Sequence, residues 1–203
     1  MRDISDYYVG ELAELEETNW YITLEYMRNY AQVKVALEEN EIHRVIEVGC
    51  GSGLIPTELP SDILYLGVDK NPTFMEYARQ KNAPTRLFEF EDVRNLGPDW
   101  LREKDYTPDL ALSFAFLKHF GLHEWDDILK TILSLAPRAV FDVQVSDYDF
   151  DNGIDFHHVT VSRERLDRVI KKAGHKCVHD VLVLEEDVAE GPMQVRIITT
   201  AKV

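Results

Sequence analysis

The sequence predicts an α/β fold: a doubly wound, mostly parallel sheet preceded by helices. Short apolar runs alternate with helical patterns from about residue 43, and the chain ends in two strand-like runs joined by a short link. Runs this apolar fit a parallel sheet that is covered on both faces. At 203 residues the chain is long enough for one domain with a sizeable core.

Five apolar runs are expected to form the parallel strands. In chain order they are HRVIEV (43–48), DILYLGVD (62–69), TRLFEF (85–90), DLALSFA (109–115) and RAVFDVQV (138–145). The terminal runs HKCVHDVLVLEE and MQVRIITTAKV are separated only by DVAEGP, which is too short for a crossover helix. These two runs should pair antiparallel, which completes a seven-stranded sheet with an antiparallel C-terminal strand.

Helices are expected between the strands. Asn71 and Pro72 form a start signal, a side-chain cap followed by proline at the first helical position. Ser162 should cap another helix, and Gly174 should end it. The segment HEWDDILKTILSLA carries an apolar face at helical spacing, made of Trp125, Ile128, Leu129, Ile132 and Leu133.

The first forty residues form a helical preface, with one apolar stripe made of Trp20, Leu24, Met27 and Ala31. We expect one domain over residues 1–203, in which residues 1–40 cover the site and residues 41–203 form the sheet and its helices. No repeat, low-complexity tract or obvious linker divides the chain.

The stretch VIEVGCGSG, residues 45–53, ends the first strand with Gly49, Gly51 and Gly53. Glycine lets ligand atoms lie against the backbone, and ligands of open parallel sheets bind at the carboxyl ends of the strands. A dinucleotide fingerprint would place its third glycine at residue 54, which is Leu54. The observed order is an acid, Glu47, followed by glycines at alternate positions.

With these residues the chain resembles the class I S-adenosylmethionine-dependent methyltransferases, over roughly residues 40–203. The resemblance implies a Rossmann-like fold and S-adenosylmethionine as the cofactor. The family's acid at the end of the second strand, which holds the ribose hydroxyls, corresponds to Asp69 in YLGVDKN. Its acid after the third strand, near the adenine amino group, corresponds to Asp92 in EFEDVRNL. DLALSFAFLKHF looks like the family's segment at the methyl-transfer site.

The resemblance implies a cofactor site formed by these motifs and their neighbours: Glu47, Gly49, Cys50, Gly51, Gly53, Asp69, Lys70, Asp92, Val93, Ser113 and Phe114. The chain departs from the family after Gly53, where Pro56 and Pro60 interrupt a usually long helix. Because proline is tolerated only in a first turn, this helix should be short or distorted.

The chemistry of the motif agrees with this cofactor. VGCGSGLIP contains no Lys or Arg, which a phosphate site normally shows. A vicinal diol is well served by a carboxylate that accepts two hydrogen bonds, which Asp69 can provide. Two structural alternatives stay open: Glu47 could pin the loop through backbone N–H groups, and Asp69 could cap the next turn.

His119 is the candidate general base, because it follows the fourth strand and imidazole titrates near neutrality. The alternative is a histidine that shapes the loop by bonding a backbone carbonyl. The acceptor site is expected to use His119 together with Tyr8, Trp20 and Tyr148, since aromatic walls hold a planar or cationic acceptor.

The segment SDYDFDNGIDFHH after the fifth strand contains acids at alternate positions, over residues 147–155. It does not fit the spacing of a calcium-binding loop. A solvated acidic loop is therefore favoured over a metal site, and no metal ligands are assigned.

Composition limits the partners. The formal net charge of −15 opposes binding to phosphate backbones, so nucleic acid is not expected. No apolar run approaches the roughly 20 residues of a membrane span, and the N-terminus lacks the apolar core of a signal peptide. The two cysteines, Cys50 and Cys177, fit a reducing compartment, so a cytoplasmic location is expected.

The sequence therefore predicts an enzyme that transfers a methyl group from S-adenosylmethionine to an oxygen or nitrogen of a small molecule. Two alternatives remain: an aminopropyltransferase-like enzyme, whose polyamine the acidic loop would hold, and a non-catalytic S-adenosylmethionine-binding protein. The acceptor and the oligomeric state cannot be read from the chain.

Overall fold

The computed structural model describes residues 20–151, 159–188 and 191–203. Its strands are β1 (Arg44–Val48), β2 (Leu64–Asp69), β3 (Arg86–Phe90), β4 (Leu110–Ser113), β5 (Arg138–Ser146), β6 (Phe150–Asp151), β7 (Val159–Ser162), β8 (His175–Val188) and β9 (Gly191–Lys202). Its helices are α3 (Trp20–Glu38), α4 (Ile55–Glu58), α5 (Pro72–Lys81), α6 (Pro98–Glu103), α7 (Leu122–Leu135) and α8 (Arg163–Lys172), with 3-10 turns η1 (Val93–Asn95) and η2 (Leu117–His119).

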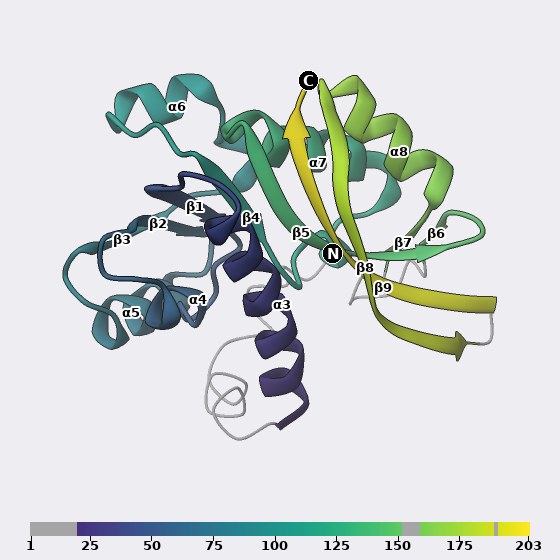
Figure 1. The fold of residues 1–203 in the computed structure, drawn as a ribbon, viewed down its shortest axis with the longest axis horizontal. Helices are drawn as coiled ribbons and strands as arrows, with labels where there is room; N and C mark the ends of the chain where they lie inside the picture. The colour runs from purple at the N-terminus through teal and green to yellow at the C-terminus, as the bar shows by residue number, and fades with distance from the viewer. Residues whose placement is uncertain (1–19, 152–158, 189–190) are drawn as a thin grey trace.

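The strands form one twisted sheet in the order β3-β2-β1-β4-β5 (Figure 1). These five strands are parallel. On the other side of β5, β9 pairs antiparallel and in turn carries β8. The predicted fold class is confirmed, including the antiparallel C-terminal strand.

Two short strands, β6 and β7, were not predicted from the sequence. They pair with each other antiparallel, and β7 continues the β4 side of β5 where β4 has ended. A strand of two residues shows no periodicity, so β6 has no sequence signal. The run VTVS of β7 ends in Ser162, which is also the cap of α8, and this helix signal is why only the helix was predicted there.

Alternation along β1 sends its side chains to opposite faces of the sheet. Ile46 and Val48 join the core with α6, α7 and α8. Val45 joins the second core with α3, α4 and α5, and Figure 1 shows these three helices together on one face of the sheet. Glu47 is therefore directed by its strand position toward the face covered by α3, α4 and α5.

The predicted helix signals are confirmed. The Asn71 side chain accepts hydrogen bonds from the backbone N–H groups of Thr73 and Phe74 at the start of α5. Ser162 caps α8, and Gly174 follows that helix with φ of +74°. All five residues of the predicted apolar face of α7 are buried. The short helix expected after Gly53 is α4, with four residues and a proline in its first turn.

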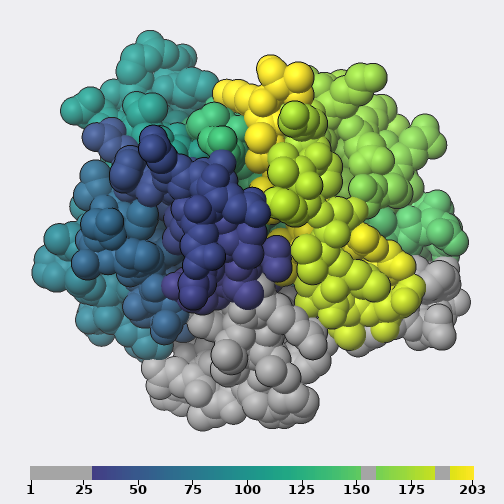
Figure 2. Space-filling model, in the orientation of Figure 1, coloured from purple at the N-terminus to yellow at the C-terminus, as the bar shows by residue number. Residues whose placement is uncertain are grey.

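The helix α3 lies between two parts of the chain that are distant in sequence. Figure 2 shows its surface between the segment that contains α4 and α5 and the β8–β9 hairpin. Val33 and Ala36 of α3 are buried in the same core as Ile55 and Ile197. The Tyr30 hydroxyl donates a hydrogen bond to the backbone carbonyl of Glu58, 2.7 Å away, which fixes α3 beside α4. The side chains of residues 20–28, and with them most of the predicted stripe, lie outside the described part.

Candidate functional site

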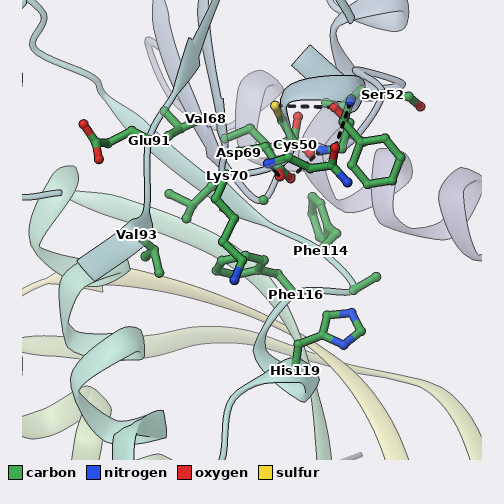
Figure 3. A pocket seen from close by; sticks show the side chains of 18 of the residues that line it. Cys50, Ser52, Val68, Asp69, Lys70, Glu91, Val93, Phe114, Phe116 and His119 are labelled. Carbon is green, nitrogen blue, oxygen red and sulfur yellow. Dashed lines mark hydrogen bonds between the residues drawn. The ribbon is translucent and has the colours of Figure 1, made fainter. Parts of the chain in front are cut away.

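A cavity of about 260 Å³ opens at the carboxyl ends of β1, β2 and β4. Ten of the residues predicted for the site line it: Glu47, Gly49, Cys50, Gly51, Asp69, Lys70, Asp92, Val93, Phe114 and His119. These residues lie at or beyond the carboxyl ends of four different strands, so the parallel sheet itself brings them together. Figure 3 shows Phe114, Phe116 and His119 on one side of the cavity and Val93 on the other, with the Lys70 side chain between them.

The glycine loop bends sharply after β1. Gly49, Gly51 and Gly53 all have positive φ, at +74°, +51° and +74°. A Cβ on Gly49 would lie 2.2 Å from the Phe116 ring, whereas a Cβ on Gly51 would meet no atom within 4 Å. Because Gly51 also lines the cavity, its bare backbone faces open space where a ligand could lie against it.

Gly53 and Ser113 were predicted for the site but are not among the residues that line the cavity. A Cβ on Gly53 would crowd Asn82 and Ala78, so this glycine lets the loop pack against α5. The Ser113 hydroxyl is buried and donates to the backbone carbonyl of Val48, 3.1 Å away, which ties β4 to the end of β1. Both residues thus shape the loop around the cavity.

Glu47 lies at the base of the cavity and is only 4% exposed. The Tyr65 hydroxyl donates a hydrogen bond to its carboxylate, with 2.5 Å between the oxygens. The pKa of Glu47 is raised to about 8, mainly because the carboxyl group is buried. The hydrogen bond from Tyr65 lowers this pKa, but by less than burial raises it. The carboxyl group therefore stays largely protonated at neutral pH in the ligand-free protein, and a bound cation would favour its ionised form.

The raised pKa predicts how stability depends on pH. The unfolded chain releases this proton near the ordinary pKa of 4.5, whereas the folded protein holds it to about pH 8. The unfolding free energy contributed by Glu47 should therefore be complete below about pH 4 and decrease between about pH 5 and 8. Urea unfolding at several pH values should show this decrease in the wild type and a flatter profile in Glu47→Gln. Parallel profiles of the two proteins would contradict the assignment.

Asp69 ends β2 and holds the glycine loop in place. Its carboxylate accepts hydrogen bonds from the backbone N–H groups of Gly51, at 3.1 Å, and Asn71, at 2.8 Å. Burial raises the pKa of Asp69, and these two N–H groups oppose the shift. A carboxylate offers about four lone-pair positions, so Asp69 can serve the loop and still accept from a ligand. The structural alternative and the binding role are compatible.

Asp92 caps η1 after β3, and its carboxylate pairs with the Arg94 guanidinium at 2.9 Å. Arg94 also pairs with Glu124 at 2.8 Å and lies 5.5 Å from the centre of the Phe120 ring. The positive charge of Arg94 is thus balanced by two carboxylates although Arg94 lines the cavity. This wall links the end of β3 to the start of α7.

The wall after β4 carries a strained turn. Ala115 has φ of +51°, which is unusual for a residue with a Cβ, and its backbone N–H donates to the Asp142 carboxylate at 2.8 Å. The following Phe116 packs edge-on against Phe120, with 4.8 Å between ring centres. His119, on η2, lines the cavity beyond these rings. The buried Asp142 therefore fixes the turn that presents Phe116 and His119.

Sequence reasoning missed several residues of the cavity: Asn29, Asn71 as a lining residue, Glu91, Arg94, Phe116 and Phe120. Four of them belong to the motifs EFEDVRNL and SFAFLKHF, which already contained predicted site residues, so the sequence indicated where these four would lie. The sequence feature that could have indicated Asn29 is its helical spacing from Val33 and Ala36, which face the core. A polar side chain on a buried face calls for a partner or a function.

Two of the predicted acceptor residues, Tyr8 and the side chain of Trp20, lie outside the described residues. Tyr148 is 48% exposed and is not among the residues that line the cavity.

In the acidic segment, Asp149 pairs with Arg165 at 2.9 Å, and Asp151 accepts from the backbone N–H of Leu122 at 3.1 Å. Both acids thus anchor β6 to the helices behind it. No group of three or more potential metal-binding side chains occurs among residues 20–151, 159–188 and 191–203.

Residues 45–137 match the family model of the methyltransferase domain. No curated protein matches the chain in sequence. Within the described ranges, none of the helices is both long enough and apolar enough to cross a membrane.

Among solved structures, the chain is similar to a 1,6-didemethyltoxoflavin-N1-methyltransferase from Burkholderia thailandensis with bound 1,6-didemethyltoxoflavin and S-adenosylhomocysteine. The TM-score is 0.73 at 16% identity, over 98% of this chain and 87% of the other. It is also similar to the magnesium protoporphyrin IX methyltransferase from Synechocystis PCC 6803 with bound S-adenosylmethionine, with a TM-score of 0.68 at 15% identity, over 90% and 82%. A TehB-like methyltransferase from Corynebacterium glutamicum matches with a TM-score of 0.58 at 18% identity, over 86% and 88%.

Proposed function

We propose that the chain is a class I S-adenosylmethionine-dependent methyltransferase, which transfers a methyl group from S-adenosylmethionine to an oxygen or nitrogen of a small molecule. The observation that carries this proposal is the arrangement of Gly51 and Asp69. The bare backbone of one and the carboxylate of the other meet at the ends of β1 and β2, inside one cavity.

These residues fit the parts of the cofactor in order along the sheet. The amino-acid part would lie against Gly49 and Gly51, and the ribose hydroxyls would donate to Asp69. The adenine would lie beside Val93 and Asp92 at the end of β3, with the Lys70 stem along it. Arg94 is the only arginine among the described residues that line the cavity, and it is already paired with Asp92 and Glu124. This pairing disfavours a ligand that carries a phosphate group.

The bound cofactor would supply a methyl group activated by a sulfonium. The protein's own contribution is to align the acceptor with that methyl group and to exclude water, which can supply about 7–11 kcal/mol of the barrier. Phe114 and Phe116 would form the apolar wall that excludes water. His119 would take the acceptor's proton where the acceptor is a hydroxyl.

A small-molecule acceptor is supported by the aromatic wall and by the charge of the protein. Phe116, Phe120 and His119 line the part of the cavity after β4, and aromatic walls suit organic ligands. Two of the similar structures are named for small acceptors, didemethyltoxoflavin and magnesium protoporphyrin IX. The net charge of −15 disfavours a nucleic acid as the acceptor.

Aminopropyl transfer finds less support. It would require free acids to hold a polyamine, whereas Asp149 is paired with Arg165 and Asp151 bonds the start of α7. Methyl transfer therefore explains more of the described site.

Calorimetric titration tests the proposal. The wild type should bind S-adenosylmethionine and S-adenosylhomocysteine and should not bind NAD. Asp69→Asn should lose a charge-assisted hydrogen bond to ribose, about 1.5–3 kcal/mol or a tenfold to hundredfold weaker affinity. It also replaces one of the two oxygens that accept from the N–H groups of Gly51 and Asn71, so circular dichroism and urea unfolding should accompany the titration to show that the variant is folded. Binding of NAD alone would refute the proposal. An acceptor-library screen with labelled cofactor would then distinguish transfer from binding without catalysis.

A further inference from the structure

Asn29 of α3 lines the cavity but has no role in the family motifs. Its side chain is buried, with the residue only 5% exposed. Its Oδ1 atom is enclosed and has no hydrogen-bond partner within the described part of the chain. Since buried polar groups are nearly always hydrogen-bonded, an unpartnered amide oxygen in a cavity wall indicates a ligand.

The position of Asn29 identifies the end of the cavity that it faces. Tyr30, the next residue, bonds the backbone of α4, which directly follows the glycine loop. Val33, one turn further along α3, packs in the same core as Ile55 and Phe114. Asn29 therefore lies at the glycine-loop side of the cavity, whereas Asp92 and Val93 follow β3, two strands away in the sheet.

The side chains at the glycine-loop end of the cavity favour a ligand group that donates hydrogen bonds and carries a positive charge. An amide oxygen only accepts hydrogen bonds. The carboxyl group of Glu47 lines the same cavity and would be stabilised in its charged form by a nearby cation. With the ribose at Asp69 and the adenine at Val93, the amino-acid part of the cofactor is the group left for the glycine-loop end.

We propose that the Asn29 side-chain oxygen accepts a hydrogen bond from the α-ammonium group of the bound cofactor, so that α3 completes the cofactor site. This inference rests on the proposed function, and it adds a binding residue from outside the sheet. Helix α3 thus selects ligands that carry the amino-acid part over nucleosides that lack it.

The test compares two ligands on matched variants. S-adenosylhomocysteine and its analogue with hydrogen in place of the α-amino group are titrated into the wild type and Asn29→Ala. Alanine suits a helix interior, so α3 should persist. Asn29→Ala should bind S-adenosylhomocysteine about tenfold to hundredfold more weakly, as for a lost hydrogen bond to a charged group. Its affinity for the deaminated analogue should equal that of the wild type.

Two further variants complete the set. Asn29→Asp keeps acceptor oxygens and should retain S-adenosylhomocysteine binding. Asn40→Ala removes another amide near the same helix, one that only donates to the backbone carbonyl of Ala36, and should leave both affinities unchanged.

The outcomes separate this inference from the proposed function. If the wild type binds S-adenosylhomocysteine and Asn29→Ala binds it equally well, the inference is wrong and the proposed function stands. An equal loss for both ligands would also overturn it, because the amide would then act on another part of the ligand or on the fold. A wild type that binds neither ligand would refute both proposals.

Discussion

Gly51→Val should abolish cofactor binding and leave the protein folded. The backbone at Gly51 has φ of +51°, and a Cβ there would meet no protein atom within 4 Å. The valine side chain would therefore project into the cavity, in the space where we place the amino-acid part of the cofactor. The left-handed backbone costs a residue with a Cβ roughly 1–2 kcal/mol, which a protein of ordinary stability, about 5–15 kcal/mol, survives. Calorimetric titration with S-adenosylhomocysteine should detect no binding.

Gly174→Val is the matched control for backbone strain. Gly174 has φ of +74°, and its Cβ would also meet nothing within 4 Å, but it ends α8 away from the cavity. The two variants should lose similar stability in urea, and only Gly51→Val should lose the ligand. Native circular dichroism together with unchanged affinity in Gly51→Val would place the cofactor elsewhere. Gly49 is a poorer test, since a Cβ there would collide with the Phe116 ring in the protein itself.

His119→Ala should slow turnover on a hydroxyl acceptor by about a hundredfold to ten-thousandfold, the usual contribution of general base catalysis. His119 lies on η2, directly after the turn held by Asp142, and lines the part of the cavity next to Phe116. Because the imidazole would act on the acceptor, affinity for S-adenosylhomocysteine should stay nearly constant.

His123→Ala controls for a general effect of removing an imidazole near this wall. His123 lies in the first turn of α7 and is not among the residues that line the cavity, so its removal should leave turnover close to wild type. An amine acceptor that arrives deprotonated needs no base, and the loss in His119→Ala should then be small. Wild-type turnover of His119→Ala on a hydroxyl acceptor would leave His119 as a structural residue of the loop.

The parallel part of the sheet could be predicted from sequence because its five runs are apolar and helix signals stand between them. The cap at Asn71 and the glycine after α8 are local interactions, so the sequence around them determines them. The pairing of β6 with β7 could not be predicted, because it depends on β5 extending past the end of β4. No residue in a two-residue strand encodes that geometry.

The site was predictable where motifs place residues at the carboxyl ends of strands. Glu47 and Asp69 stand at the carboxyl ends of β1 and β2, Asp92 follows the end of β3, and the structure brings all three to one cavity. Asn29 could not be found in this way, since it reaches the cavity from a helix whose packing is set by Tyr30, Val33 and Ala36. The hydrogen bond from the Gly51 N–H to Asp69 was likewise hidden, because it depends on how the loop closes over β2.

The place of β9 in the sheet has a consequence for the order in which the protein can fold. β9 lies between β5 and β8 and pairs with β5 from Arg138 to Val145, so contacts distant in sequence complete the centre of the sheet. During synthesis on the ribosome, β5 emerges well before β9 and presents an unpaired edge with apolar side chains. Exposed edges of this kind invite pairing with other chains, and long-range pairings form slowly. The nascent protein therefore passes through a stage that is prone to aggregation, which ends when the β8–β9 hairpin docks.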